Sequence, residues 1–190
     1  TVLGTSTLSG TLTVAPGGAV TNTGKLAVTG TTTIAAGAGN NITLGTATNV
    51  FTGALILSGN SITVAATGAV NLGATTTAAN LSVTSTGAIT DSGTLTVPGT
   101  TTLNAGSTAI TLDQAASAFT GAVSLTGSNA SVLNTLATVL GVSTLTGNLG
   151  VTSTAGAVTN TGKLAVTGTT TVNAGAGNNI TLGTATNTFG

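Results

Sequence analysis

The segment GAVTNTGKLAVTGTTTIAAGAGNNITLGTATNVF, residues 18–51, is the most informative part of the sequence, because the chain repeats it. It returns at residues 156–189, an offset of 156 − 18 = 138, with changes only at Ile34, Ala35 and Val50. A looser copy begins at Gly87, an offset of 87 − 18 = 69. Repetition at a fixed period is typical of stacked architectures, in which each unit contacts only its neighbours. We therefore expect a repeat array instead of a conventional globular domain.

The array predicted from this period is a single continuous solenoid of units of about 69 residues. The unit boundaries divide the 190 residues into a partial unit, two complete units and another partial unit, at residues 1–17, 18–86, 87–155 and 156–190. Repeat arrays need terminal caps with a polar outer face, and neither end carries an atypical segment. We therefore expect this chain to be a fragment of a longer protein.

Apolar residues alternate with small polar ones over short runs, as at Leu26/Val28, Ile42/Leu44 and Ile62/Val64. A spacing of two is the period of a strand with one buried face, and threonine, valine and isoleucine favour strands. The runs are separated by corner signals such as Pro16-Gly17-Gly18 and Pro98-Gly99. The sequence therefore predicts an all-β protein.

Nine or ten such runs per unit, taken three to a rung, predict three rungs per unit, where a rung is one complete circuit of the backbone. Dividing the unit by three, 69/3, gives a predicted rung of about 23 residues. Stacked rungs pair in parallel, and the sterics of parallel crossovers favour a right-handed coil. The predicted fold class is thus all-β, a right-handed parallel β-helix with three short strands per rung.

Charge is almost absent: the chain has two basic and two acidic residues, no histidine and no cysteine. The chain has too few basic residues for a surface that binds nucleic acid. Without cysteine it can form neither disulfides nor thiolate zinc sites. No apolar run approaches the ~20 residues of a membrane-spanning helix, so we expect no membrane insertion of this segment. A chain with so little charge tends to associate, and we expect self-association into fibres among its partners.

The acidic residues are Asp91 and Asp113, and neither recurs at the equivalent positions of the other copies. General acid–base catalysis needs a titratable pair, and a nucleophilic triad or a zinc site needs residue types that are missing here. We therefore predict no catalytic, cofactor-binding or metal-binding residues, no cofactor and no enzymatic activity. Lys25 and Lys163 occupy equivalent positions, and we interpret them as solvated residues that discourage lateral pairing.

Two further residue sets recur. Phe51, Phe119 and Phe189 hold one equivalent position per copy, and we expect each to fill a corner of the core. The chain also contains threonine triplets. Several ice-binding solenoid proteins order water with regular rows of threonine, in which every rung carries the motif. The triplets of this chain lie at irregular intervals, so we interpret them as strand-forming residues on an uncharged face. The triplets are Thr31–Thr33, Thr75–Thr77, Thr100–Thr102 and Thr169–Thr171.

The motif Gly-Ala-Ile/Val-Thr-x-Ser/Thr-Gly-x-Leu-x-Val occurs at residues 18–28, 87–97 and 156–166. In this motif the chain resembles the repeat region of filamentous-haemagglutinin-like exoproteins, which are large bacterial adhesins exported by two-partner secretion. Large autotransporter passengers have similar repeats. The resemblance implies a right-handed parallel β-helix, a secreted or cell-surface extracellular location, and the role of a stalk.

Together these observations predict a structural stalk or fibre segment of an extracellular adhesin or biofilm-matrix protein. The adhesive target would be a glycan, a host surface or a neighbouring cell. The alternative is a binding module that presents a threonine- and asparagine-rich face to glycan or ice. Because charge is scarce, we also expect the stability to be almost insensitive to pH and salt.

Overall fold

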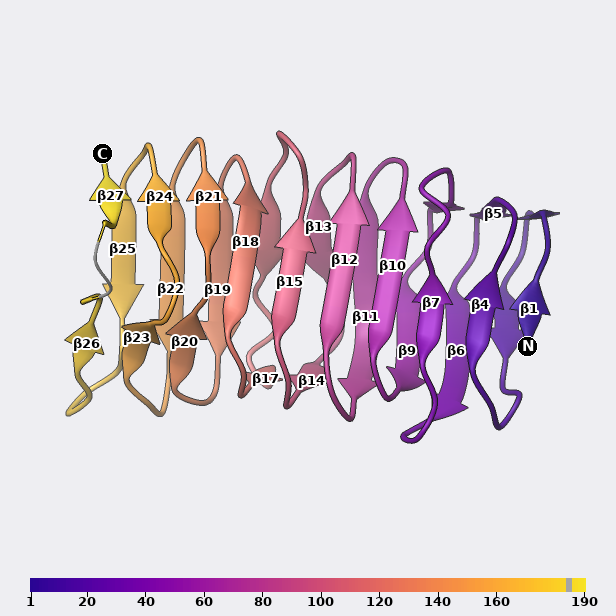
Figure 1. Ribbon diagram of the computed structural model, residues 1–190, viewed down its shortest axis with the longest axis horizontal. Coiled ribbons are helices and arrows are strands. Elements are labelled where there is room, and N and C mark those ends of the chain that lie inside the picture. Colours follow the sequence, from indigo (N-terminus) through magenta and orange to yellow (C-terminus); the bar gives the residue numbers. More distant parts are fainter. Residues whose placement is uncertain (184–185) are drawn as a thin grey trace.

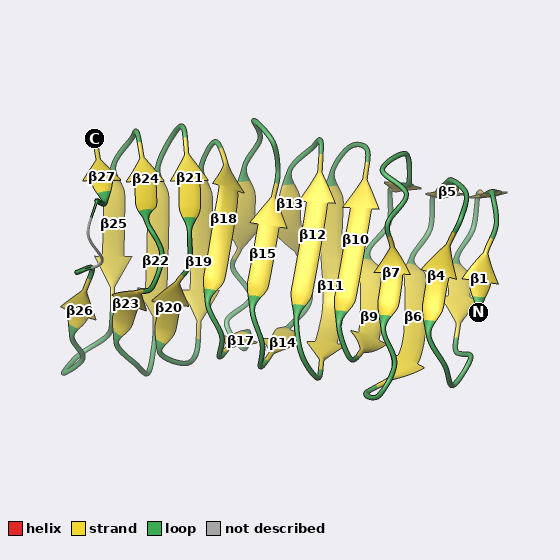
Figure 2. Cartoon of the chain, viewed as in Figure 1, coloured by secondary structure: helices red, strands yellow, loops and turns green. Residues whose placement is uncertain are grey.

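The fold is described from a computed structural model, which describes residues 1–183 and 186–190. The described residues form strands joined by loops and turns, and none of them lies in a helix (Figure 2). The backbone coils repeatedly around one long axis, and each rung stacks on the next (Figure 1). Strands of neighbouring rungs pair in parallel, for example Ile62 with Leu81 and Ile89 with Ile110. The predicted parallel β-solenoid is therefore confirmed.

Two long sheets make up the walls of the solenoid. The strands on the near side of Figure 1, here called the front sheet, all run upwards. The strands behind them, the back sheet, run downwards, and the chain advances from right to left, so the coil is right-handed (Figure 1). The front sheet comprises β1 (Val2–Leu3), β4 (Val20–Asn22), β7 (Ile42–Leu44), β10 (Ile62–Ala66), β12 (Leu81–Ser85), β15 (Thr101–Asn104), β18 (Val123–Gly127), β20 (Thr138–Leu140), β23 (Val158–Asn160) and β26 (Ile180–Thr181). The back sheet comprises β3 (Leu12–Val14), β6 (Thr32–Gly37), β9 (Leu55–Gly59), β11 (Val70–Thr77), β13 (Ile89–Asp91), β16 (Ile110–Leu112), β19 (Ala130–Asn134), β22 (Leu149–Ser153) and β25 (Thr170–Asn173).

Short third strands lie at the corners between the two long sheets. Near both ends of the rod they follow a front strand and lie along its upper edge, whereas in the middle they follow a back strand and lie along the lower edge (Figure 1). The upper strands are β2 (Ser6–Leu8), β5 (Leu26–Val28), β8 (Val50–Phe51), β21 (Ser143–Leu145), β24 (Leu164–Val166) and β27 (Thr188–Phe189). The lower strands are β14 (Leu95–Val97) and β17 (Ala118–Phe119).

The rungs are shorter than predicted. The numbers of Val20 in β4 and Val158 in β23 differ by 158 − 20 = 138, and seven front-sheet pairings separate the two strands. A rung of this stacked array therefore averages 138/7, or about 20 residues. The predicted rung length of 69/3 = 23 is wrong. That prediction divided the repeat unit by a whole number of rungs, whereas one unit makes three and a half.

The half rung places successive copies of the repeat on opposite walls. Val20 and Val158 lie in the front sheet, while the equivalent Ile89 of the middle copy lies in the back sheet. Both walls have one face towards the core and one towards solvent, and therefore require the same alternation of apolar and polar residues. A segment with that alternation fits either wall, so the sequence pattern does not reveal which wall it occupies.

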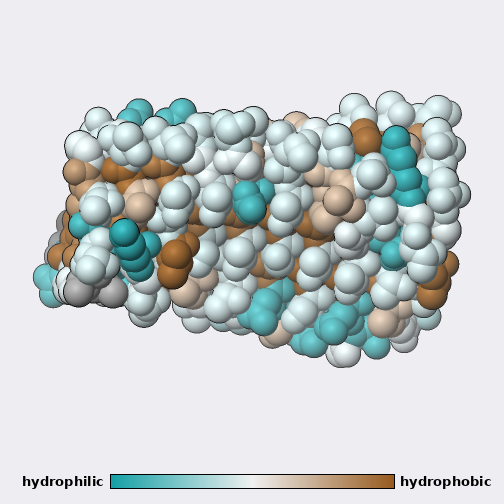
Figure 3. All heavy atoms as spheres, turned by 45° about the horizontal axis from the view of Figure 1, so that its top comes forward, coloured by the Kyte–Doolittle hydropathy of each residue, from teal (hydrophilic) through white to brown (hydrophobic). Residues whose placement is uncertain are grey.

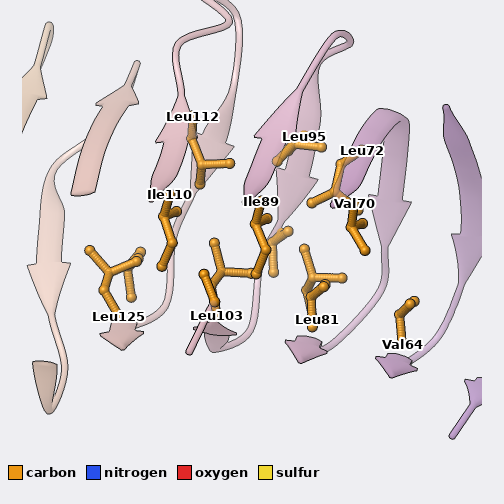
Figure 4. Close-up of a cluster of buried hydrophobic side chains, with 14 of the residues drawn as sticks. Val64, Val70, Leu72, Leu81, Ile89, Leu95, Leu103, Ile110, Leu112 and Leu125 are labelled. Atoms are coloured by element: carbon orange, nitrogen blue, oxygen red, sulfur yellow. The ribbon is translucent and has the colours of Figure 1, made fainter. Parts of the chain in front are cut away.

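The core is a continuous stack of aliphatic side chains between the two walls. Figure 4 shows Leu81, Leu103 and Leu125 of the front sheet extending towards Ile89 and Ile110 of the back sheet. Each of these side chains is at most 1 % exposed. The predicted inward residues Leu26, Val28, Ile42 and Leu44 are equally buried, which confirms the alternation.

Corners are tight where glycines of successive rungs stack on one another. A Cβ atom at Gly30 would lie 2.7 Å from the backbone of Gly10, and one at Gly53 would lie 2.5 Å from the backbone of Gly30. Carbon atoms cannot approach so closely without displacement, so these corners accept only glycine. The recurrence of these glycines reflects the contact between rungs.

Three equivalent threonines introduce hydroxyl groups into the core wall. The Oγ1 atoms of Thr32, Thr101 and Thr170 are buried and have no hydrogen-bond partner among the described residues. In the sheet ladder, Thr101 lies between Leu81 and Val123. A buried hydroxyl without a partner costs about 1–3 kcal/mol of stability.

Replacing Thr101 by valine is therefore expected to stabilise the protein by about 1 kcal/mol, because a methyl group replaces the unpaired hydroxyl. Thermal unfolding followed by circular dichroism measures the change. Thr75→Val is the matched control, since Thr75 is equally buried but its Oγ1 donates to the Gly73 carbonyl over 3.1 Å. Stabilisation of both variants to the same extent would contradict this explanation.

Candidate functional site

Among the charged residues, the two aspartates are neighbours, and the two lysines lie at equivalent corners of other copies. Lys25 and Lys163 are exposed at equivalent corners, just before β5 and β24, as expected for solvated residues. Asp113 is also exposed, whereas Asp91 is buried in the back sheet. The described part of the chain has no cavity or cleft, and no group of three or more acidic, histidine or cysteine side chains that could hold a metal ion.

A pair of asparagines, Asn22 and Asn49, organises the corner beside β5. Asn49 is fully buried, and its Oδ1 accepts hydrogen bonds from the Leu26 N–H (2.9 Å) and from Asn22 Nδ2 (2.8 Å). Its Nδ2 donates to the carbonyls of Leu44 (3.3 Å) and Ala65 (3.1 Å). One side chain thereby satisfies backbone groups on three successive rungs.

The same pair recurs in the last copy, at an offset of 187 − 49 = 138. Asn187 Oδ1 accepts hydrogen bonds from the Leu164 N–H (2.9 Å) and Asn160 Nδ2 (3.1 Å), and Asn187 Nδ2 donates to the Leu182 carbonyl (3.1 Å). Sequence reasoning missed these residues, because an asparagine between two apolar runs resembles an ordinary corner signal. The recurrence of the residue could have suggested a structural role, but its burial could not have been predicted.

The middle copy has a different pair at this corner, Asp91 and Ser117. Ser117 replaces the buried asparagine, and its Oγ accepts a hydrogen bond from the Leu95 N–H over 3.0 Å. Asp91 replaces Asn22, and its Oδ1 accepts a hydrogen bond from the Asp113 N–H over 2.9 Å. Asp91 Oδ2 is buried without a partner among the described residues. In the other copies, Asn22 and Asn160 each donate from Nδ2 to the carbonyl two positions further on, over 2.8 and 2.9 Å.

Burial raises the pKa of Asp91 above its usual value, because it disfavours the charged carboxylate. The backbone N–H groups of Asp113 and Gln114 act in the opposite direction, and the negative charge of Asp113 adds to the increase in pKa. The folded chain therefore binds a proton at Asp91 more readily than the unfolded chain does. The stability that this contributes is fully present below the ordinary pKa of 3.8 and is lost as the pH rises through the raised value.

Asp91→Asn is consequently expected to stabilise the protein at pH 7, by about 1 kcal/mol, because an amide removes the buried charge and supplies a donor. The gain should shrink towards pH 3, where the native aspartate is protonated. Melting curves between pH 3 and pH 8 test this, with the exposed Asp113→Asn as control. A gain independent of pH would contradict it. Asp91 is thus an exception to the expected insensitivity of stability to pH.

The recurrent phenylalanines fill the corners as expected in two of the three copies. Phe51 and Phe119 are 2 % and 0 % exposed. Phe189 is 45 % exposed, and no described strand lies beyond β27 to cover it. The position is therefore a core position that becomes buried when another rung stacks on it.

Asparagines also line the outer corners in rows. Asn80 Oδ1 accepts hydrogen bonds from the Thr100 N–H (2.8 Å) and Thr100 Oγ1 (3.0 Å) on the next rung. At the corner that leads into the back sheet, Asn129 Oδ1 accepts from the Asn148 N–H (2.8 Å), and Asn148 Oδ1 accepts from the Thr169 N–H (2.9 Å). These exposed side chains take up N–H groups that the turns leave free, so their role is structural.

The threonine triplets do not form outward ranks. Thr32, Thr75, Thr77 and Thr101 are buried within the walls, because alternate residues of a strand face opposite sides. A regular row of outward-facing hydroxyl side chains does exist on the front sheet, but only Thr102 among its six members belongs to a triplet. Its members are Thr21, Thr43, Thr63, Ser82, Thr102 and Ser124.

A family model described as "Repeats of unknown function (DUF5649)" matches residues 1–58, 59–126 and 127–190. The second and third copies begin at an offset of 127 − 59 = 68, close to the period seen in the sequence. No curated protein and no solved structure matches the chain. Within the described residues, no helix has the length and apolar character needed to cross a membrane.

Proposed function

The chain belongs to the DUF5649 family of repeats of unknown function, and we propose that it is a rigid rod that serves as a stalk or fibre segment. In this proposal the rod forms part of an extracellular bacterial adhesin or biofilm-matrix protein and catalyses no reaction. It holds an adhesive region away from a surface, or builds a matrix by its length and stiffness.

The observation that carries the proposal is the unbroken path of strand pairings along the rod. The front sheet runs from β1 to β26 through parallel pairings, and the back sheet runs from β3 to β25. In such a sheet the hydrogen bonds lie along the rod axis. Each rung is thereby joined to the next on both walls, and the aliphatic core behind these bonds would resist bending of the rod.

The half-rung offset between copies supports a role that depends on length. Seven rungs complete the double repeat, an offset of 138, and return the same side chains to the same wall. Further double repeats would extend the rod along one axis, without a new interface, because every rung meets the same surroundings. At about 4.8 Å per rung, each double repeat would add about 34 Å.

The extracellular setting is proposed from the resemblance of the 18–28, 87–97 and 156–166 motif to filamentous-haemagglutinin-like repeats. The composition agrees with it. A chain without cysteine forms no premature disulfide that would hinder export, and its few charged residues leave threonine, serine and asparagine to hydrate the surface.

Small-angle X-ray scattering tests the rod. The maximum dimension of the chain is compared with that of a variant in which residues 18–155 are duplicated in register. The proposal expects an increase of about 34 Å with an unchanged cross-section. A variant that grows in cross-section, or that bends back on itself, would refute the stalk role.

The location is tested separately on bacteria that produce the full-length protein. Immunogold electron microscopy with antibodies against this segment should label the cell surface or the surrounding matrix. Labelling confined to the cell interior would refute the extracellular assignment while leaving the rod itself unaffected.

A further inference from the structure

Six hydroxyl-bearing side chains form one straight row on the outer face of the front sheet. The sheet register pairs Thr21 with Thr43, Thr43 with Thr63, and Thr63 with Ser82. It continues from Ser82 to Thr102 and from Thr102 to Ser124. The sequence positions of successive members differ by unequal steps of 22, 20, 19, 20 and 22, so the regularity exists only in the folded chain. Irregular spacing in the sequence therefore does not argue against a water-ordering face.

A second row runs beside the first, two positions further along each strand. It consists of Ala65, Thr84, Asn104 and Thr126, which the register also places side by side. Strands β10, β12, β15 and β18 therefore present a two-column array of small side chains. Neighbouring parallel strands lie about 4.8 Å apart, and alternate residues of a strand lie about 6.6 Å apart.

The hydroxyl groups of the first row are not used within the protein. None of the six has a hydrogen-bond partner among the described residues, and each side chain is exposed or half-buried. Elsewhere the chain does use such groups. Ser117 Oγ and Ser143 Oγ accept N–H donors from neighbouring rungs, and Thr67 Oγ1 donates to a carbonyl over 2.8 Å. The front row is thus free to bind an external partner.

The face has neither charge nor aromatic rings. Strands β7, β10, β12, β15 and β18 contain no charged residue and no phenylalanine. The surface in Figure 3 is predominantly pale, the colour of residues with intermediate hydropathy such as threonine and serine. A partner would therefore be uncharged, and would be held by hydrogen bonds and methyl contacts.

The first row is continuous, and four of its six residues are threonines. Threonine is branched at Cβ and has few χ1 states in a strand, so its hydroxyl and methyl groups are fixed relative to the backbone. No register shift interrupts the front sheet between β4 and β18, whereas the back sheet has shifts in β6 and β11 and carries the exposed Ile56. The front sheet is the more regular of the two walls.

We propose that the outer face of the front sheet from β7 to β18 binds the surface of ice. Ice is an uncharged solid whose hydrogen-bonding groups repeat in two dimensions at spacings close to those of adjacent strands and alternate residues. Rigid hydroxyl groups can take the places of lattice water, and the methyl groups between them can hold the neighbouring waters in order. A flat glycan crystal is the weaker candidate, because this face offers no aromatic ring for a sugar to stack on.

The test measures how much of the chain enters a growing ice hemisphere, together with inhibition of ice recrystallisation. The native chain should concentrate in the ice, and the double variant Thr63→Lys/Thr102→Lys should enter it at least tenfold less. Thr94→Lys and Thr111→Lys are the controls: the first lies at a corner where the other copies carry lysine, and the second lies on the outer face of the back sheet. Both controls should behave like the native chain.

Each other outcome would overturn the proposal. These outcomes are exclusion of the native chain from ice, binding to crystalline cellulose or chitin but not to ice, and equal loss in the controls. Circular dichroism establishes that each variant is folded. If the lysine pair unfolds the chain, Thr63→Ala/Thr102→Ala replaces it and must also reduce incorporation.

Discussion

Replacing Phe119 by alanine is expected to lower the free energy of unfolding by about 3–5 kcal/mol. The ring is fully buried at the lower corner in β17, where its backbone pairs with Val97. Its removal would leave a cavity that the corner cannot close, because Asn134 holds the backbone of Phe119 by two hydrogen bonds, of 2.9 and 3.0 Å. Denaturant unfolding followed by circular dichroism measures the loss.

Phe189→Ala is the matched control, since Phe189 holds the equivalent position but is 45 % exposed. Its removal should cost less than about 1 kcal/mol. Hydrogen exchange should show that Phe119→Ala opens β14 and β17 first, because a stacked array can loosen locally. If the two variants lost the same free energy of unfolding, burial by the next rung would not determine how much this phenylalanine contributes to stability.

Replacing Asn49 by leucine is expected to cost about 3 kcal/mol or more, because several buried backbone groups lose their partners together. The Leu26 N–H and the carbonyls of Leu44 and Ala65 all bond to this side chain. Leucine is of similar size, so the loss would come from unpaired polar groups more than from a cavity. Thermal and denaturant unfolding measure it.

Asn49→Ser supplies the graded control, because Ser117 occupies the equivalent position in the middle copy and accepts the corresponding N–H from Leu95. Serine should restore part of the stability that leucine loses. The exposed corner residue Asn41, replaced by alanine, should cost less than about 1 kcal/mol. If Asn49→Ser lowered the stability as much as Asn49→Leu, the hydrogen bond from the Leu26 N–H would not be the main contribution of Asn49 to stability.

Prediction from sequence was most accurate where the signal is local. The alternation Leu26/Val28 and Ile42/Leu44 marks side chains that are buried, and Pro16-Gly17-Gly18 and Pro98-Gly99 fall between strands. It failed for rung length, since the rung is closed by corners of variable length. It also failed to identify Asn49 as a core residue, because an asparagine between two apolar runs can be either an exposed corner residue or a buried one that bonds to three rungs.

An all-β solenoid, with alternate residues in the core and few of the side chains that catalysis uses, was predictable from the order of the amino acids. Strand alternation and repetition can both be recognised along the chain without knowledge of which rungs meet. The three-dimensional arrangement was needed to see that one repeat unit makes three and a half rungs, that successive copies lie on opposite walls, and that Thr21 to Ser124 form one row. These features depend on which residues of neighbouring rungs are paired. Because the corners differ in length, paired residues are not separated by a constant number of positions in the sequence.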